Sequence, residues 1–310
     1  MIPLRQAVED YLTMRRSLGF KLRDMGNNLH HFVSFMEQQG TSLITSELAL
    51  HWAMQPQGVQ PALWAARLSF VRSFARYWSA TEPRTEIPPM GLLPYRYKRT
   101  TPYIYSDDEI RQILNRAKCL PPTTGLRPWT YYTLFGLMAV TGMRISELIR
   151  LDYGDVDLDQ QLLTIRLTKF SKSRLIPLHP STVKKLILYR DRRDQLFPRP
   201  AIPRFFLSNQ GNPLTDCMVR WTFIRLSRQI GLRRPGDSFG PRIHDFRHRF
   251  AVTTLLHWYQ NGVDVEQRLP ALSAYLGHAH VTDTYWYLSA IPELLAVTKD
   301  RLEKRWEAFS

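Results

Sequence analysis

Apolar side chains return every three or four positions through most of the first eighty residues, which is the spacing of a helix with one buried face. Thr45 stands where a helix beginning at residue 46 would need its N-cap. Four helices are predicted, over residues 6–20, 27–40, 46–54 and 60–80. The pattern therefore predicts a helical domain over residues 1–85.

The helical pattern stops after the fourth helix. Residues 81–103 contain five prolines and one glycine, which oppose regular structure. Their second half is basic, with Arg96, Lys98 and Arg99. We expect residues 86–103 to be a basic linker that either wraps a duplex or is a solvated tether.

Residues 104–310 combine helical patterns with one strand-like region. Ser106 and Glu109 have the spacing of a capping box at a helix start. Leu162–Leu167 and Arg174–Leu178 are typical of two strands joined as a hairpin. Further helices are predicted over residues 127–142, 181–196, 216–231, 245–260, 263–276 and about 292–310. The sequence thus predicts a mainly α fold with a small antiparallel β-sheet, in the α+β class.

Composition narrows the class of protein. The chain has 310 residues, is 44% hydrophobic and 22% charged, and carries a net charge of +15, so we expect a globular protein that binds a polyanion. No apolar run reaches the roughly 18–20 residues of a membrane-spanning helix, and the start lacks the apolar region of a secretory signal. Cys119 and Cys217 are too few for a disulfide framework or a zinc cluster. We expect a cytoplasmic protein without metal or cofactor.

The fourth predicted helix interleaves cations with aromatic side chains. Arg67, Arg72 and Arg76 lie on it among phenylalanine, tyrosine and tryptophan. Such a stripe is either a solvated basic face or a helix laid along DNA phosphates.

Six residues, spread along the predicted second domain, suit attack on a phosphodiester. That reaction needs cations for the non-bridging oxygens, a nucleophile and an acid for the leaving oxygen. Arginine offers a permanent planar charge that matches phosphate, and a tyrosine in a cationic field can act as the nucleophile. The candidates are Arg144, Lys169, His244, Arg247, His278 and Tyr287.

Residue type and spacing leave alternatives for several of these positions. Arg144 by itself also fits a surface ion pair with Glu147. His244 and the arginine three residues later share a helix face, but a histidine that caps a helix has the same pattern. The competing neighbours are His248, His280 and Tyr285.

The order of the motifs resembles the tyrosine recombinase, or phage integrase, family. The matching motifs are TGMRISEL, a lysine hairpin, HDFRH, LGH and a tyrosine nine residues beyond that histidine, within residues 103–290. The resemblance implies a core-binding DNA-binding domain over residues 1–85 and a tyrosine-recombinase-type catalytic domain over residues 104–310. It also implies that a C-terminal exchange helix, about residues 292–310, docks on the next subunit.

The resemblance also implies a role for each candidate. Tyr287 matches the nucleophile, and His244 would assist proton transfer from it. Glu147 matches an acidic position that orients other members of the site. Counting back from the second strand favours Lys169 over Lys172 as the general acid, where many relatives have Gly-Lys-Gly and this chain has Thr-Lys-Phe-Ser-Lys. The implied catalytic set is Arg144, Lys169, His244, Arg247, His278 and Tyr287.

The function implied is that of a site-specific recombinase for a mobile genetic element. Such an enzyme cuts and rejoins double-stranded DNA through a 3′-phosphotyrosyl intermediate, without ATP or metal, as a homo-tetramer and with or without an accessory protein. Three alternatives are a catalytically inactive DNA-binding protein of the same fold, a topoisomerase IB-like nicking enzyme and a basic membrane-associated protein. The complete set of catalytic residue types disfavours the first, and interspersed charge without an anchor disfavours the last.

Overall fold

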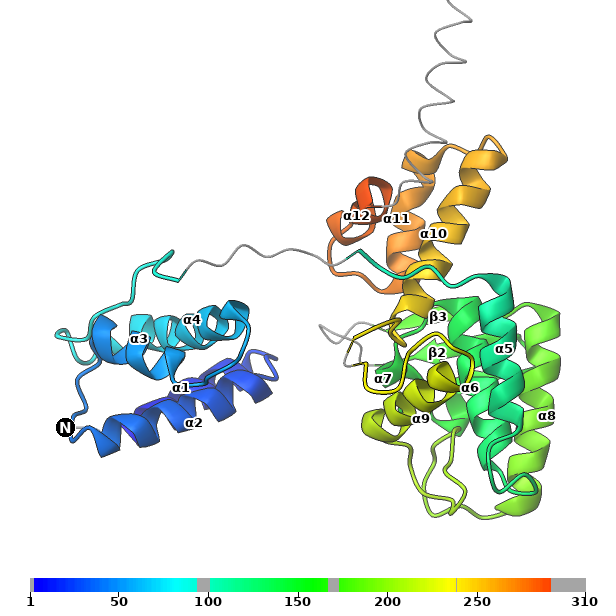
Figure 1. The fold of residues 1–310 in the computed structure, drawn as a ribbon, viewed down its shortest axis with the longest axis horizontal. Helices are drawn as coiled ribbons and strands as arrows, with labels where there is room; N and C mark the ends of the chain where they lie inside the picture. The colour runs from blue at the N-terminus through cyan, green and yellow to red at the C-terminus, as the bar shows by residue number, and fades with distance from the viewer. Residues whose placement is uncertain (1–2, 94–100, 167–172, 238, 291–310) are drawn as a thin grey trace, which may run out of the picture. The chain divides into compact units, whose positions relative to one another are not determined.

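A computed structural model describes residues 3–93, 101–166, 173–237 and 239–290. The chain divides into two compact units, residues 1–100 and 101–310, and each has its own hydrophobic core (Figure 1). The predicted exchange helix and the three cations of the predicted linker lie outside the described residues.

The first unit consists of four helices, as the apolar pattern predicted. They pack around a core that includes Leu12, Phe32, Trp52 and Phe74, each with at most 1% of its surface exposed. The side chain of Thr45 accepts a hydrogen bond from Leu48 N, so it is the N-cap of the third helix. The helices are α1 (Leu4–Ser17), α2 (Arg23–Gln38), α3 (Ser46–Met54) and α4 (Pro61–Trp78).

The first part of the predicted linker packs on this helical unit. Glu86 N donates to Ile44 O at 2.9 Å. Arg72 on α4 donates from Nε to Pro88 O at 2.6 Å and from Nη2 to Pro89 O at 2.8 Å. These contacts fix the chain against α4 well past residue 86.

The arginines of α4 do not form one free basic face. Arg67 lies 3.8 Å above the Trp52 ring and donates from Nη2 to Trp52 O at 2.9 Å. Arg72 is bonded to the two proline carbonyls, whereas Arg76 is exposed. Two of the three arginines therefore hold the fold of this unit together.

The second unit is mostly helical around a small sheet. Its three strands pair antiparallel in the order β1-β2-β3, with Leu162 opposite Pro177 and Ile165 opposite Arg174. The strands are β1 (Val156–Asp157), β2 (Leu162–Ile165) and β3 (Arg174–Pro177), and a short 3-10 helix, η1 (Tyr153–Asp155), precedes β1. The helices are α5 (Asp107–Lys118), α6 (Arg127–Thr141), α7 (Ile145–Leu148), α8 (Pro180–Leu196), α9 (Asp216–Gln229), α10 (Asp245–Gln260), α11 (Val265–Leu276) and α12 (Thr282–Ala290).

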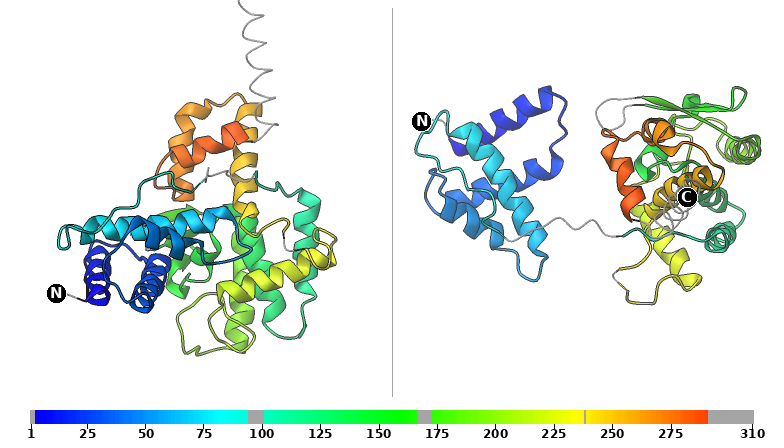
Figure 2. Two further views of the ribbon diagram at one scale, coloured as in Figure 1. Left: turned by 60° about the vertical axis from the view of Figure 1, so that its left-hand side comes forward. Right: turned by 90° about the horizontal axis from the view of Figure 1, so that it is seen from above.

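Two hydrophobic clusters organise this unit. The larger one buries α6 and the sheet, and includes Phe135, Leu163 and Ile176. The smaller one joins α10, α11 and α12 through residues such as Leu255 and Leu269. These last three helices form one group in both views of Figure 2. The first half of α10 reaches the larger cluster through buried Phe246, so the helix connects the two cores.

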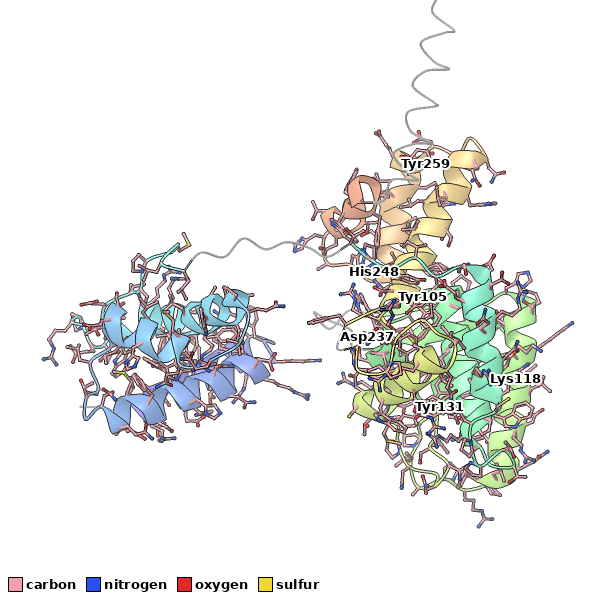
Figure 3. All side chains as sticks on the ribbon, viewed as in Figure 1. Tyr105, Lys118, Tyr131, Asp237, His248 and Tyr259 are labelled. Atoms are coloured by element: carbon pink, nitrogen blue, oxygen red, sulfur yellow. The ribbon has the colours of Figure 1, made fainter. Side chains whose placement is uncertain are left out.

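Tyr105, just before α5, anchors the start of the second unit on α10. Its ring is buried and stacks on Phe246 at 4.9 Å between ring centroids. Its hydroxyl donates to Arg242 O at 2.9 Å, and Arg249 Nε donates to its carbonyl at 2.8 Å. Figure 3 labels Tyr105, and it also labels His248, which belongs to α10. The segment that directly follows the predicted linker is therefore bound to α10, the helix that carries Arg247 of the H-x-x-R motif.

The structure confirms the predicted fold class, a mainly α protein with a small antiparallel sheet. The capping box at Ser106 and Glu109 is present, and α6 ends where Gly142 was expected to stop it. Helix α7 begins directly after Arg144, where the glycine turn predicted a helix start, whereas α12 was not predicted. In the part of the chain that the structure describes, no helix has the length and apolar character needed to cross a membrane.

Candidate active site

Arg144 is placed by a tight turn at the end of α6. Gly142 has φ +61°, and a Cβ there would lie 2.7 Å from a ring atom of Phe250, so glycine is needed for this turn. Arg144 then directly precedes α7, and its backbone N donates to Glu147 Oε2 at 2.9 Å. Its guanidinium donates from Nη1 to Glu147 Oε1 at 2.9 Å and from Nη2 to Gly277 O at 3.1 Å.

Arg247 reaches the same place from α10. It is buried, and donates from Nη1 to Gly142 O at 2.9 Å and from Nη2 to Leu276 O at 2.5 Å. Arg144 Nη1 also reaches Leu276 O, at 3.4 Å. Burial, followed by the nearby Arg144 charge, lowers the pKa of Arg247, but a guanidinium starts so high that it stays protonated at neutral pH. The two predicted arginines therefore converge on the end of α11.

A third arginine, which sequence reasoning did not select, joins them. Arg174 opens β3 and donates from Nη1 and Nη2 to the two carboxylate oxygens of Glu147, at 3.1 and 2.8 Å. Its Nε donates to Tyr275 O at 2.8 Å. Burial raises the pKa of Glu147, but Arg174 and Arg144 outweigh it and hold that pKa below its ordinary value. Glu147 is therefore an ionised carboxylate shared by two arginines.

Tyr287 is brought to this cluster by α12, and its hydroxyl lies 2.9 Å from His248 Nδ1. The Tyr287 ring is 1% exposed, whereas Tyr285 on the same helix is 47% exposed. The His278 and Tyr287 rings stack at 6.5 Å between centroids, and His278 Nδ1 lies 2.7 Å from Thr284 Oγ1. The structure thus brings Tyr287, and not Tyr285, to the predicted histidines and arginines.

The histidine beside the Tyr287 hydroxyl is His248, whereas the resemblance implied that His244 assists proton transfer. His248, considered only as a neighbour, is buried and adjoins the Tyr287 hydroxyl, while His244 precedes α10 and contacts the His248 ring edge to face at 4.8 Å. Crowding by protein atoms, then the charges of Arg247 and Arg144, lowers the pKa of His244 to about 4, although part of the ring reaches solvent. The four-residue spacing of His244 and His248 places both on one helix face, which could have identified His248.

The lysine position is not part of this geometry. Lys169 and its alternative Lys172 lie outside the described residues, between β2 and β3. The pairing of the two strands is described up to Ile165 and Arg174. The predicted general acid therefore stays a prediction.

The described cluster carries an excess of positive charge. Arg144, Arg174 and Arg247 contribute three charges and Glu147 removes one, which leaves two. An excess of buried positive charge favours an anion such as a phosphodiester. Within residues 3–93, 101–166, 173–237 and 239–290, no group of three or more His, Cys, Asp or Glu side chains is arranged to hold a metal ion.

The comparisons with known proteins agree with this geometry. The model of the phage integrase family matches residues 105–293. The integrase/recombinase y4rB of Sinorhizobium fredii is 52% identical over 311 residues, covering 99% of each chain. The cluster of arginines, histidines and Tyr287 thus lies within the part of the chain that matches the family model.

Solved structures share the fold. The Tn1549 transposon integrase in complex with transposon right end DNA matches with a TM-score of 0.66 at 16% identity, covering 97% of this chain and all of that one. A lambda integrase tetramer bound to a Holliday junction matches with a TM-score of 0.60 at 19% identity, covering 91% and 79%. The chain belongs to the phage integrase family and is a tyrosine site-specific recombinase, an enzyme that cleaves and rejoins DNA.

Proposed function

We propose that this recombinase cuts DNA with Tyr287 as its nucleophile. The observation that carries the proposal is the hydroxyl of Tyr287, 2.9 Å from His248 Nδ1 beside two arginines that converge on the end of α11. A phenol has an ordinary pKa near 10, so it needs a base and a cationic field to attack at neutral pH. His248 accepts the phenolic proton and the arginines supply the field.

Each bond change then has an assigned group. The phenolic oxygen bonds to phosphorus, and the bond from phosphorus to the 5′ oxygen breaks, leaving a 3′-phosphotyrosyl link. Arg144, Arg247 and His278 bind the non-bridging oxygens, whose charge grows in the transition state. Lys169 gives its proton to the departing 5′ oxygen. A 5′-hydroxyl of the partner strand reverses the step, so no external energy source is consumed.

Cleavage requires a movement of α12. Tyr287 is 1% exposed, and its ring packs in the cluster formed with α10 and α11. A phosphate in duplex DNA can meet the hydroxyl only after the buried tyrosine becomes accessible. We propose that DNA binding and subunit assembly provide that movement.

The substrate is double-stranded DNA at two recombination sites. The net charge of +15 fits a polyanion, and the similar structures include recombinases bound to DNA and a lambda integrase tetramer on a Holliday junction. We propose that four copies act together on DNA of a mobile element, joined through the C-terminal segment, residues 292–310. The helical domain over residues 1–85 would bind the DNA, and the catalytic domain over residues 104–310 would cut it.

The nucleophile is tested by trapping the covalent intermediate. Purified protein is incubated with labelled DNA from the flanks of its own gene, nicked close to the cleavage point so that the released fragment is lost. After denaturation in detergent, label should travel with wild-type protein and with Tyr285→Phe, and not with Tyr287→Phe. Tyr285 is a matched control because it lies on the same helix and is exposed. Adduct lost only in Tyr285→Phe would move the nucleophile, and no adduct on bound DNA would contradict the proposed cleavage.

A further inference from the structure

Arg174 connects three parts of the site that lie far apart in the sequence. It opens β3, it holds Glu147 of α7 with both Nη atoms, and it holds the carbonyl of Tyr275 near the end of α11. Its side chain is 11% exposed and that of Glu147 is 6% exposed. A buried, two-pronged contact between arginine and carboxylate fixes geometry more strictly than a surface ion pair.

Glu147 is shared between Arg174 and Arg144. The carboxylate accepts from Arg144 N and Nη1 and from both Nη atoms of Arg174. A carboxylate bound to one arginine alone would neutralise it. With two arginines on Glu147, part of the charge of Arg144 stays available to a phosphate.

Arg174 also helps to fix the end of α11. Arg174 donates to the carbonyl of Tyr275. Arg247 and Arg144 both donate to the carbonyl of Leu276, and Arg144 also donates to that of Gly277. Cations are favoured at a helix C-terminus by the orphan carbonyls and the helix dipole. His278 follows directly, so its position depends on how these carbonyls are held.

The glycine of the LGH motif makes room for this arginine. Gly277 has φ +66°, and a Cβ there would lie 2.7 Å from Arg174 Nη1. Glycine is favoured here because α11 ends at this position in the left-handed conformation. The structure adds a second reason, since a Cβ would force the Arg174 guanidinium to shift.

We propose that Arg174 is a positioning residue for cleavage: by sharing Glu147 it keeps Arg144 available to phosphate, and by holding Tyr275 O it sets His278. This inference rests on the proposed phosphotyrosyl function, and Arg174 itself is not required to touch the DNA.

The test measures single-turnover adduct formation at saturating nicked DNA, with DNA affinity and thermal unfolding determined for each protein. Arg174→Met should slow adduct formation about 10²-fold, the order seen when one preorganised electrostatic group is lost, with DNA affinity changed less than about threefold. Arg174→Lys keeps a charge but cannot make the two-pronged contact, so it should fold and give an intermediate rate. A wild-type rate in either variant overturns the proposal.

Two further proteins separate positioning from simple loss of structure. Arg193 is 3% exposed at its side chain and bonds to Asp194 and to Arg204 O, so Arg193→Met removes an even more deeply buried arginine away from the site. It should lower stability and leave the adduct rate unchanged. The double variant Arg174→Met with Glu147→Gln should cleave about tenfold faster than Arg174→Met, because the amide no longer neutralises Arg144.

The outcomes distinguish the two proposals. If the double variant is no faster than Arg174→Met, or if Arg193→Met slows the rate as much as Arg174→Met, Arg174 is merely structural and the inference is wrong. If the wild-type protein forms no adduct on bound DNA, the proposed function fails and the inference fails with it.

Discussion

Two arginines that bond to backbone carbonyls, one in each unit, have different roles. Arg72 in the helical unit donates to the carbonyls of Pro88 and Pro89, and Arg247 in the catalytic unit donates to those of Gly142 and Leu276. The local chemistry is the same, since each guanidinium satisfies two carbonyls. What differs is the surroundings.

Arg72 ties a passing segment to α4, whereas Arg247 is one of three arginines around a single carboxylate. The excess positive charge in the second case destabilises the empty site, because buried charge without a partner is costly. An anion removes that cost. The comparison teaches that the hydrogen bonds of such an arginine do not show whether its role is structural or functional. The charges of its neighbours do.

The largest effect is expected when Arg247 and Arg72 are each replaced by methionine. Arg247→Met should slow adduct formation by about 10²–10³-fold, because a transition-state charge loses a preorganised partner. Arg72→Met should leave the rate at saturating DNA unchanged and lower only the unfolding temperature of the helical unit. Rates are measured on nicked DNA and stability by thermal unfolding. Equal losses of rate in the two variants would remove the distinction.

A second test alters the space around the arginines without changing any charge. Gly277→Ala places a Cβ 2.7 Å from Arg174 Nη1 at φ +66°, and should cost about 1–3 kcal/mol and slow adduct formation about tenfold. Gly231→Ala is the control, because φ there is +77° and nothing lies within 4 Å of the added Cβ. Urea unfolding and adduct rates are compared. If both alanine variants cleave at the same rate, crowding of Arg174 has no role in catalysis.

A third test asks which arginines of α4 contact DNA. Arg76 is exposed, so Arg76→Met should weaken DNA binding severalfold and lower the salt dependence of binding by about one counterion. Arg67 is held on Trp52, so Arg67→Met should cost about 1–2 kcal/mol of stability and leave the salt dependence unchanged. Binding is titrated at several salt concentrations. The opposite pattern would restore the view of α4 as a basic face along DNA.

The smallest expected effect concerns pH. The folded pKa of His244 is lowered to about 4 from 6.5, so between these values the unfolded chain takes up a proton that the folded chain does not. Stability should therefore fall as pH drops from 6.5 toward 4, and be unaffected by His244 above 6.5. Contact of the ring with solvent keeps the effect small. Urea unfolding between pH 4 and 7.5 should show a shallower slope for His244→Asn, and equal slopes would show that His244 is not perturbed.

The sequence predicted elements well where local chemistry decides them. The capping residues Thr45 and Ser106 and the stop at Gly142 depend on near neighbours, and all three occur as predicted. Helix α12 was missed although α3 has the same length, because α3 was recognised with the help of its cap Thr45, whereas no cap was identified for α12, which is held by packing on α10 and α11. Short elements depend on tertiary contacts more than long ones do.

The catalytic motifs named Arg144, Arg247, His278 and Tyr287, and the structure brings these four residues together. Arg174 was not found, because nothing in its local sequence distinguishes it from other arginines. Its importance comes from partners 27 and 101 positions away. His248 was set aside for a similar reason, since its partner hydroxyl is 39 positions away.

The sequence by itself determined the family, the fold class and the residue types of the chemistry, because motif order and apolar period are properties of the chain. Only the tertiary structure decided which histidine lies beside the nucleophile. It also decided which arginines only bind backbone carbonyls and which can interact with an anion. The physical reason is that electrostatic interactions depend on distance and burial. Both quantities are set when α7, α10, α11 and β3 pack together.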